Sequence, residues 1–314
     1  MKTASGAVAV QVVWSSRLGS RKIEHIGSAH DAELAALRIE PSVCPAGIIS
    51  GMSGDSSSLG FDTNVPNIAR VYDFFLGGKD HYAADRELAA QIAELSPDWV
   101  QACRDNRCFV GRAVTWAAGQ GIRQFLDLGA GLPTHPAVHE TAREITPDAR
   151  VCYVDNDPVV VTHARALLTK PAGVDVAEAD LSDPVGVLEH SGVTSIIDWS
   201  EPVCVLLAMV LHFYDPVMAR ELAGGYASRL APGSVLAISC GRNDDPDMWQ
   251  RMRENYTAAT TYNHTRDELR SFFGTLKLVP PGLALASTWR GGMTDVPDRP
   301  PGPAYVLAAV GVKH

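Results

Sequence analysis

The sequence predicts an α/β fold in which helices cover a doubly wound, mainly parallel sheet. Two observations predict this fold. Short apolar runs typical of buried strands alternate with helical stretches over most of the chain, which is the pattern of βαβ units. One of these runs, residues 124–128, ends in a glycine-rich turn that leads into a helix. With 314 residues, 46% of them hydrophobic, the chain is long enough to bury such a core.

Residues 1–60 differ from the rest of the chain and are predicted to form a flexible leader. They lack sustained periodicity and end in a Gly- and Ser-rich stretch, residues 51–60. Met52 stands just before the first strong helix signal, so one hypothesis is that the natural chain starts there and that residues 1–51 are not native. An N-terminal mass measurement on protein expressed from its own gene tests this hypothesis, and a mature chain that begins at residue 1 or 2 refutes it.

Residues 61–121 are predicted to form a helical cap that precedes the sheet. Apolar side chains recur at the spacing of one helix face at Ile68, Val71, Tyr72 and Phe75. Asn64 is the expected N-cap of this helix, and Gly77 with Gly78 ends it. Two further helices are expected at residues 83–95 and 97–118.

The remaining residues, 122–314, are predicted to form the sheet domain. Its seven expected strands lie near residues 124–128, 150–154, 174–177, 203–209, 234–240, 276–279 and 305–310. Seven strands are enough for a doubly wound sheet, in which ligands bind beyond the carboxyl ends of the strands.

Composition excludes several classes of protein. The net charge of -9 disfavours a wide contact with nucleic acid, because such binding requires clustered Lys and Arg. No apolar run approaches the roughly 20 residues that span a bilayer, so no membrane partner is expected. The six cysteines form no CxxC pair and have no metal-ligand spacing with histidine, which favours reduced thiols, a cytoplasmic location and no metal site.

The most informative segment is the turn that follows residues 124–128. Gly129 and Gly131, with Ala130 between them, allow a tight turn and a close approach of a ligand to the backbone. The third glycine of the dinucleotide fingerprint is absent from this stretch, which contains Pro133, and this argues against a pyrophosphate on the helix N-terminus. A methionine-sulfonium cofactor has no pyrophosphate, so the turn favours S-adenosylmethionine over NAD.

Acidic residues end three successive predicted strands. Asp127, Asp155 and Asp180 are expected to meet at one edge of the sheet. Asp155 is predicted to accept hydrogen bonds from a ribose diol, Asn156 and Asp180 to lie at the adenine, and Asp127 to lie near the methionine portion. Leu181 follows Asp180 and is assigned to the same site. The alternative is that these acids only cap helices or close turns.

The fourth predicted strand, residues 203–209, is expected to end beside the transferred group. Ala208 and Met209 are therefore assigned to the cofactor site, and His212 is the candidate for a proton acceptor. The alternative is that Met209 packs in the core and that His212 is a hydrogen-bonded structural residue.

Several motifs resemble those of a family of S-adenosylmethionine-dependent methyltransferases that is common in actinobacteria and was long catalogued as a domain of unknown function. The resemblance covers about residues 64–312. It rests on the segments NIARVYDFFLGGKDHYAADRE (residues 67–87), IRQFLDLGAGLPT (122–134), ARVCYVDNDPVV (149–160), EADLSDP (178–184) and VLLAMVLHFYDP (205–216).

This resemblance implies the seven-stranded, Rossmann-like sheet of class I methyltransferases, with the last strand antiparallel beside the fifth. It also implies that the N-terminal helical cap closes over the cofactor through a GGKD turn, residues 77–80. Arg70 and Lys79 are expected to supply cations for the amino-acid carboxylate, and the alternative is that they form a solvated helix face and a helix-end cation. The cap residues assigned to the cofactor site are Arg70, Tyr72, Gly77, Gly78 and Lys79.

Together the motifs predict an S-adenosylmethionine-dependent methyltransferase that acts on a small molecule, with secondary metabolism as its expected setting and the acceptor unassigned. Methyl transfer from an activated donor depends mainly on alignment, so no catalytic dyad is required. Two alternatives stay open: a non-catalytic S-adenosylmethionine-binding regulatory protein, and an NAD-dependent oxidoreductase that uses the same crevice. The sequence carries no signal for the oligomeric state.

Overall fold

The computed structural model describes residues 8–15, 21–29, 62–169, 171–291 and 302–314. The chain divides into two compact units, Met1–Asp55 and Ser56–His314. In the first unit, strands β1 (Val8–Ser15) and β2 (Arg21–Ala29) pair antiparallel. The other residues of the expected leader, Met52 among them, lie outside the described residues, and the interpretation of this segment stays a prediction.

The second unit contains an eight-stranded sheet with the order β5-β4-β3-β6-β7-β10-β8, and β9 pairs with β10. Its strands are β3 (Gln124–Leu128), β4 (Arg150–Asp155), β5 (Val174–Glu178), β6 (Cys204–Ala208), β7 (Val235–Asn243), β8 (Lys277–Leu278), β9 (Ala284–Leu285) and β10 (Ala304–Val312). Neighbouring strands from β5 to β7 are parallel, whereas β10 is antiparallel to β7. The predicted α/β fold and its seven strands are therefore confirmed, and the short β9 is additional.

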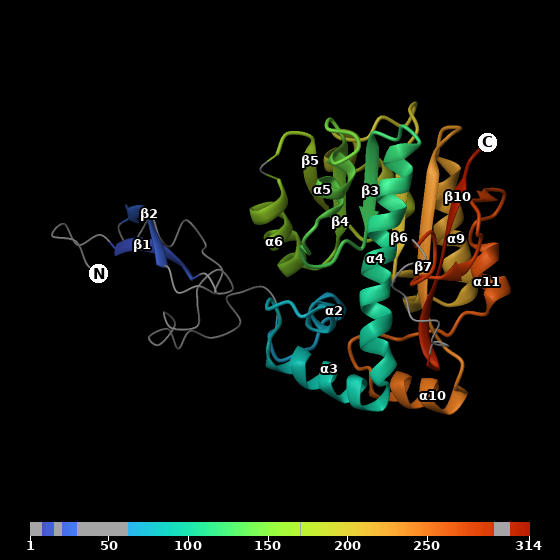
Figure 1. Ribbon diagram of the computed structural model, residues 1–314, viewed down its shortest axis with the longest axis horizontal. Helices are drawn as coiled ribbons and strands as arrows, with labels where there is room; N and C mark the ends of the chain where they lie inside the picture. Colours follow the sequence, from blue (N-terminus) through green and yellow to red (C-terminus); the bar gives the residue numbers. More distant parts are fainter. Residues whose placement is uncertain (1–7, 16–20, 30–61, 170, 292–301) are drawn as a thin grey trace. The chain divides into compact units, whose positions relative to one another are not determined.

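Helices surround this sheet. They are α2 (Ile68–Leu76), α3 (Ala83–Leu95), α4 (Pro97–Gly119), α5 (Val138–Arg143), α6 (Pro158–Leu168), α7 (Pro184–Glu189), α8 (Ser191–Thr194), the 3-10 helix η3 (Leu211–Phe213), α9 (Pro216–Ser228), α10 (Pro246–Asn255) and α11 (Arg266–Ser271). The three helices expected before the sheet are present as α2, α3 and α4. Figure 1 shows α4 running along the sheet, where it contacts β6, β7 and β10.

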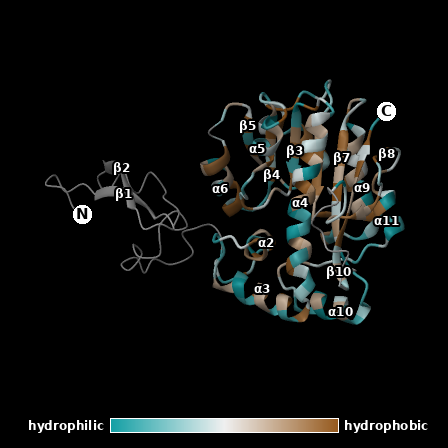
Figure 2. Ribbon diagram, viewed as in Figure 1, coloured by the Kyte–Doolittle hydropathy of each residue, from teal (hydrophilic) through white to brown (hydrophobic). Residues whose placement is uncertain are grey.

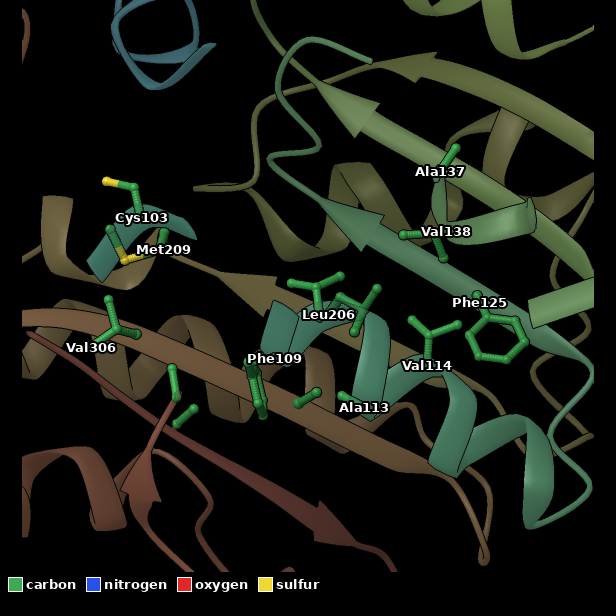
Figure 3. Packing of buried hydrophobic residues seen from close by; sticks show 14 of the residues in the cluster. Cys103, Phe109, Ala113, Val114, Phe125, Ala137, Val138, Leu206, Met209 and Val306 are labelled. Carbon is green, nitrogen blue, oxygen red and sulfur yellow. The ribbon is translucent and has the colours of Figure 1, made fainter. Parts of the chain in front are cut away.

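The long helix α4 packs its apolar side against the centre of the sheet. Phe109 and Val114 of this helix are buried in one cluster with Phe125 of β3 and Leu206 of β6, and Figure 3 shows Val114 beside Phe125. Full burial of one such side chain stabilises the fold by about 1.5–3 kcal/mol. The strands are hydrophobic along much of their length in Figure 2, and β3 is buried throughout. This packing fixes the first half of α4 near the carboxyl ends of the strands.

The start of α2 differs from the prediction, because its N-cap is Asn67 and not Asn64. Asn67 Oδ1 accepts hydrogen bonds from the backbone N–H groups of Ala69 and Arg70, at 2.8 and 3.4 Å. The side-chain amide of Asn67 also donates to Asp157, the N-cap of α6. Asn67 therefore ties the helical cap to the loop that follows β4.

No helix among the described residues is both long enough and apolar enough to cross a membrane.

Candidate functional site

A cavity of about 430 Å³ lies at the carboxyl ends of the parallel strands. Its wall is formed by α2, the first half of α4, the loops after β3, β4, β5 and β6, and residues in and just after α10. This is the edge at which open α/β sheets bind their ligands.

The glycine turn after β3 forms one wall of the cavity. Gly129 has φ 67° and Gly131 has φ 65°, the left-handed region that glycine adopts without strain. A Cβ built at Gly129 would overlap Val210, whereas a Cβ built at Gly131 would meet nothing within 4 Å. Both glycines are thus required by backbone conformation, and Gly131 leaves open space where a ligand can approach the backbone.

Asp155, at the end of β4, is bonded to the turn. Its Oδ2 accepts from the Gly131 N–H at 2.9 Å, and its Oδ1 accepts from the Asp157 N–H at 3.0 Å. Burial raises the pKa of Asp155, and the backbone donors of Asp157 and Gly131 partly oppose this rise. A carboxylate has about four acceptor sites, so Asp155 retains capacity for further donors from the cavity.

Asp127, at position four of β3, is buried in the same wall. Burial raises the pKa of Asp127 to about 6, while the nearby Arg107 lowers it and Asp155 raises it. The carboxyl group therefore changes its charge close to neutral pH, as groups in functional sites often do.

This raised pKa predicts that Asp127→Asn becomes more stable relative to the wild type as the pH rises. The folded protein holds the proton up to about pH 6, whereas the unfolded chain releases it near the ordinary value of 3.8. Relative to the amide variant, the wild type should therefore lose about 2 kcal/mol of unfolding free energy between pH 4 and pH 7. Urea unfolding of both proteins across this range measures the difference, and parallel pH profiles would contradict the raised pKa.

Most of the sequence-predicted site residues line this cavity. They are Tyr72, Asp127, Gly129, Ala130, Gly131, Asp155, Asn156, Leu181, Ala208, Met209 and His212. Arg70, Gly77, Gly78, Lys79 and Asp180 are not among the lining residues.

Arg70 contacts Asp85 and does not line the cavity. It is 2% exposed, and its Nε donates to Asp85 Oδ2 at 2.8 Å while its Nη2 donates to the Val65 carbonyl at 2.7 Å. Asp85 also accepts from the Tyr82 N–H, so the pair joins the starts of α2 and α3. The structure therefore gives Arg70 a contact inside the cap in place of the expected contact with a ligand carboxylate.

The GGKD turn lies behind the cavity wall, and Lys79 is exposed. Gly77 closes α2 with φ 81°, and a Cβ at Gly78 would overlap the carboxylate of Asp73. Asp73 itself lines the cavity and accepts from the Asp80 N–H at 3.0 Å. The turn thus wraps around Asp73 and positions that side chain, which the sequence did not single out.

Gly78→Ala should therefore destabilise the protein by about 1–3 kcal/mol, because the added methyl group must displace Asp73. Gly224→Ala is the matched control, since a Cβ there meets nothing within 4 Å inside α9. This control should be neutral or stabilising by up to about 1 kcal/mol. Urea midpoints of both variants give the comparison, and equal midpoints would show that the turn tolerates a side chain.

Asp180 closes a turn after β5. Its side chain is exposed, and Oδ1 accepts from the Ser182 N–H at 2.8 Å. The neighbouring Leu181 does line the cavity. The carboxylate therefore matches the turn-closing alternative better than the adenine contact that the sequence suggested.

A polar chain that the sequence did not reveal connects the cap to the end of β6. Asn106 Nδ2 donates to Tyr72 Oη at 2.8 Å, and Ser239 Oγ donates to Asn106 Oδ1 at 2.5 Å. The Met209 N–H in turn donates to Ser239 Oγ at 3.1 Å. Met209 has φ 57°, a strained value for a residue with a side chain, and this chain holds it beside the cavity.

Arg107 of α4 is also new to the site. It is the one Lys or Arg among the lining residues of the described chain. Its Nη2 donates to the carbonyl groups of Thr134, at 3.1 Å, and Pro136. The spacing of residues along α4 gives no sign that this arginine faces the glycine turn. The direction of its side chain depends on how α4 crosses the sheet.

His212 lies in η3 and is 3% exposed. It lines the cavity, and its Nδ1 is buried with no hydrogen-bond partner among the described residues. Burial lowers the pKa of His212 to about 3, with a further contribution from His264. The imidazole is therefore neutral near pH 7, when one ring nitrogen donates and the other accepts.

A family model described as S-adenosyl methyltransferase matches residues 55–314 of this chain. The search of curated proteins gives no match.

Two solved structures are similar over most of their length. A protein from Thermobifida fusca YX, assigned to the methyltransferases, is 39% identical, and the match covers 81% of this chain and 97% of that chain with a TM-score of 0.76. A DUF574 family protein from Streptomyces avermitilis MA-4680 is 33% identical, with 81% and 99% covered and a TM-score of 0.77.

Proposed function

Because the chain belongs to the S-adenosyl methyltransferase family and is an S-adenosylmethionine-dependent methyltransferase, we propose that its cavity holds this cofactor beside a small-molecule acceptor. The observation that carries this proposal is that Asp127, Asp155 and the turn at residues 129–131 line one cavity. Three groups suited to one adenosyl ligand are thus brought together from two neighbouring strands.

The cavity fits such a ligand in size and chemistry. Its volume of about 430 Å³ lies within the roughly 300–1,000 Å³ of small-molecule sites. The open space at Gly131 allows the ligand to approach the backbone. The carboxylates of Asp127 and Asp155 suit ribose hydroxyl donors and a cationic sulfur. A purely apolar crevice would offer these groups no partner.

Within this site we assign the ribose to Asp155 and the adenine to Asn156 and Leu181. The methionine portion is assigned to Asp127 and to residues 129–131, and Arg107 is the cation for its carboxylate. We assign the sulfur position to Tyr72, Ala208 and Met209, which line the same cavity. The GGKD turn is one of the motifs by which the chain resembles the actinobacterial family. It contributes to the site by positioning the side chain of Asp73.

S-adenosylmethionine, when bound, supplies a methyl group that the positive sulfur activates. The chain itself has to bind and orient the donor and the acceptor. Orientation of this kind is worth about 7–11 kcal/mol in favourable cases. The glycine turn and Asp155 would fix the donor, while buried residues of α4 and η3 would exclude water from the acceptor.

We further propose that residues 61–121 act as the cap and residues 122–314 as the catalytic domain of a cytoplasmic enzyme of secondary metabolism. The cysteines of the described chain are free, which supports a reducing compartment. The net charge of -9 supports a small-molecule acceptor over a nucleic acid.

Calorimetric titration with S-adenosylmethionine, S-adenosylhomocysteine and NAD tests the cofactor assignment. The first two should bind and NAD should not, whereas tight NAD binding without binding of the other two would contradict it. Turnover separates the enzyme from a regulatory binder: mass spectrometry of extracts incubated with the protein and S-adenosylmethionine should show a compound that gains one methyl group.

A further inference from the structure

Part of the cavity that the proposed cofactor residues do not account for is walled by aromatic and apolar side chains. We call these residues the aromatic wall: Trp99, His212, Phe213, Trp249, Met252 and Tyr256. They come from the first turn of α4, from η3 and from α10 with its C-cap. Three separate elements therefore place aromatic rings on one side of the cavity.

The aromatic wall is held by its own ring contacts. The rings of Phe213 and Tyr256 stack with centroids 6.4 Å apart and planes 15° apart. The rings of Trp99 and His212 meet edge to face at 6.4 Å. A Cβ at Gly241 would overlap the Trp99 ring, so this glycine of β7 makes the room that Trp99 occupies. A preformed arrangement of this kind selects flat ligands, which stack or pack edge-on against it.

The aromatic wall itself carries no charged side chain. The lining residues of the described chain from 209 to 261 include no Asp, Glu, Lys or Arg. A charged acceptor would lose its hydration there without gaining an ionic partner, which is costly. The portion of the acceptor that meets the aromatic wall should therefore be uncharged.

His212 adds one specific polar contact. Its ring lies against Trp99 and Phe213, and its buried Nδ1 has no partner in the described chain. A buried polar group without a partner is unusual, and this marks the ring of His212, which lines the cavity, as a candidate for a functional role. A neutral imidazole can donate to, or accept from, the hydroxyl group of a bound molecule.

From these observations we infer that the methyl acceptor is an uncharged aromatic compound whose nucleophilic hydroxyl group hydrogen-bonds to His212. The inference rests on the proposed methyltransferase function of the same cavity. In the reaction, a lone pair of the hydroxyl oxygen forms the new O–C bond while the C–S bond breaks and its electron pair returns to sulfur. The hydroxyl proton passes to the unprotonated ring nitrogen of His212.

His212 need not be a strong base for this step. The oxygen becomes strongly acidic as its bond to the methyl group forms, so an imidazole whose pKa is about 3 can still take the proton at that stage.

The test uses the full chain saturated with S-adenosylhomocysteine and three matched probes: 2-naphthol, 2-naphthoate and the saturated alcohol 2-decalol. Ligand-observed NMR titration should show 2-naphthol binding at least about tenfold more tightly than the other two. Binding of 2-naphthoate or 2-decalol as tight as that of 2-naphthol, or no binding of 2-naphthol, would overturn the inference.

Variants separate the hydrogen bond from the shape of the cavity. His212→Phe should weaken the binding of 2-naphthol by about tenfold and leave the binding of naphthalene unchanged. His212→Gln should restore part of the lost affinity for 2-naphthol. Equal weakening of both probes would argue against the hydrogen bond. If His212→Phe does not fold, Tyr256→Leu and Tyr256→Phe test the aromatic wall. Only the leucine variant should weaken the binding of 2-naphthol.

A titration of the same samples with S-adenosylhomocysteine separates this inference from the function on which it rests. If the wild type does not bind S-adenosylhomocysteine, the proposed function fails. If it binds S-adenosylhomocysteine but not 2-naphthol, only the acceptor class fails.

Discussion

Replacement of Asp155 by alanine should weaken the binding of S-adenosylhomocysteine by at least about 100-fold. The carboxylate is assigned to two ribose hydroxyl groups, and a hydrogen bond to a charged group contributes about 1.5–3 kcal/mol. The change also removes the acceptor of the Gly131 N–H, which would loosen the glycine turn. Isothermal titration calorimetry of the folded variant measures the loss.

Asp180→Ala is the matched control for this experiment. Asp180 is also an acid near the carboxyl end of a strand, but its side chain accepts from the Ser182 N–H and does not line the cavity. Its replacement should change the affinity by less than about threefold. An affinity of Asp155→Ala within threefold of the wild type would show that the ribose binds elsewhere.

Replacement of Asp85 by alanine should destabilise the protein by about 3–5 kcal/mol. Asp85 is fully buried and bonds to Arg70, so its removal leaves a buried guanidinium without its carboxylate. The backbone N–H groups of Asn67 and Tyr82 lose the same acceptor, at 2.9 and 2.7 Å. Urea unfolding monitored by circular dichroism measures the change.

Asp148→Ala serves as the control for the buried pair. Asp148 pairs with Arg123, and the two side chains are 64% and 65% exposed. Exposed pairs of this kind contribute about 0–1 kcal/mol, so the urea midpoint of this variant should be close to that of the wild type. A loss for Asp85→Ala as small as that for Asp148→Ala would mean that the cap does not depend on the buried pair.

The fold was largely predictable because strands and cap helices carry local patterns. Residues 124–128 were expected as a strand and form β3 with the same bounds. The end of α4, at Gly119, lies one residue beyond the prediction. The N-cap of α2 was predicted wrongly because Asn64 and Asn67 are both competent caps, and the choice depends on the contact of Asn67 with Asp157 across the fold.

The site was predictable where topology alone brings residues together. Asp127 and Asp155 lie at or next to the carboxyl ends of neighbouring parallel strands, so their meeting follows from the strand order. Arg107 and Asn106 could not be found in this way, because their direction depends on how α4 crosses the sheet. Asp73 was missed for a similar reason, since the shape of the turn at Gly78 becomes visible only in three dimensions.

Arg70 illustrates the limit of assigning ligands by residue type. An arginine beside a cofactor site suggests a carboxylate ligand, but a buried acid within the chain satisfies the same chemistry. Asp85 lies fifteen positions away, on the next helix, and takes this contact. The pairing follows from the packing of α2 on α3, which spacing along one helix does not reveal.

A crystal structure of the complex with S-adenosylhomocysteine tests the central claim most directly. Electron density for the adenosyl group should lie in the cavity, with the ribose against Asp155 and the amino-acid portion beside Gly131 and Asp127. Density for the ligand at any other place on the chain, with this cavity filled by rearranged side chains, would contradict the account.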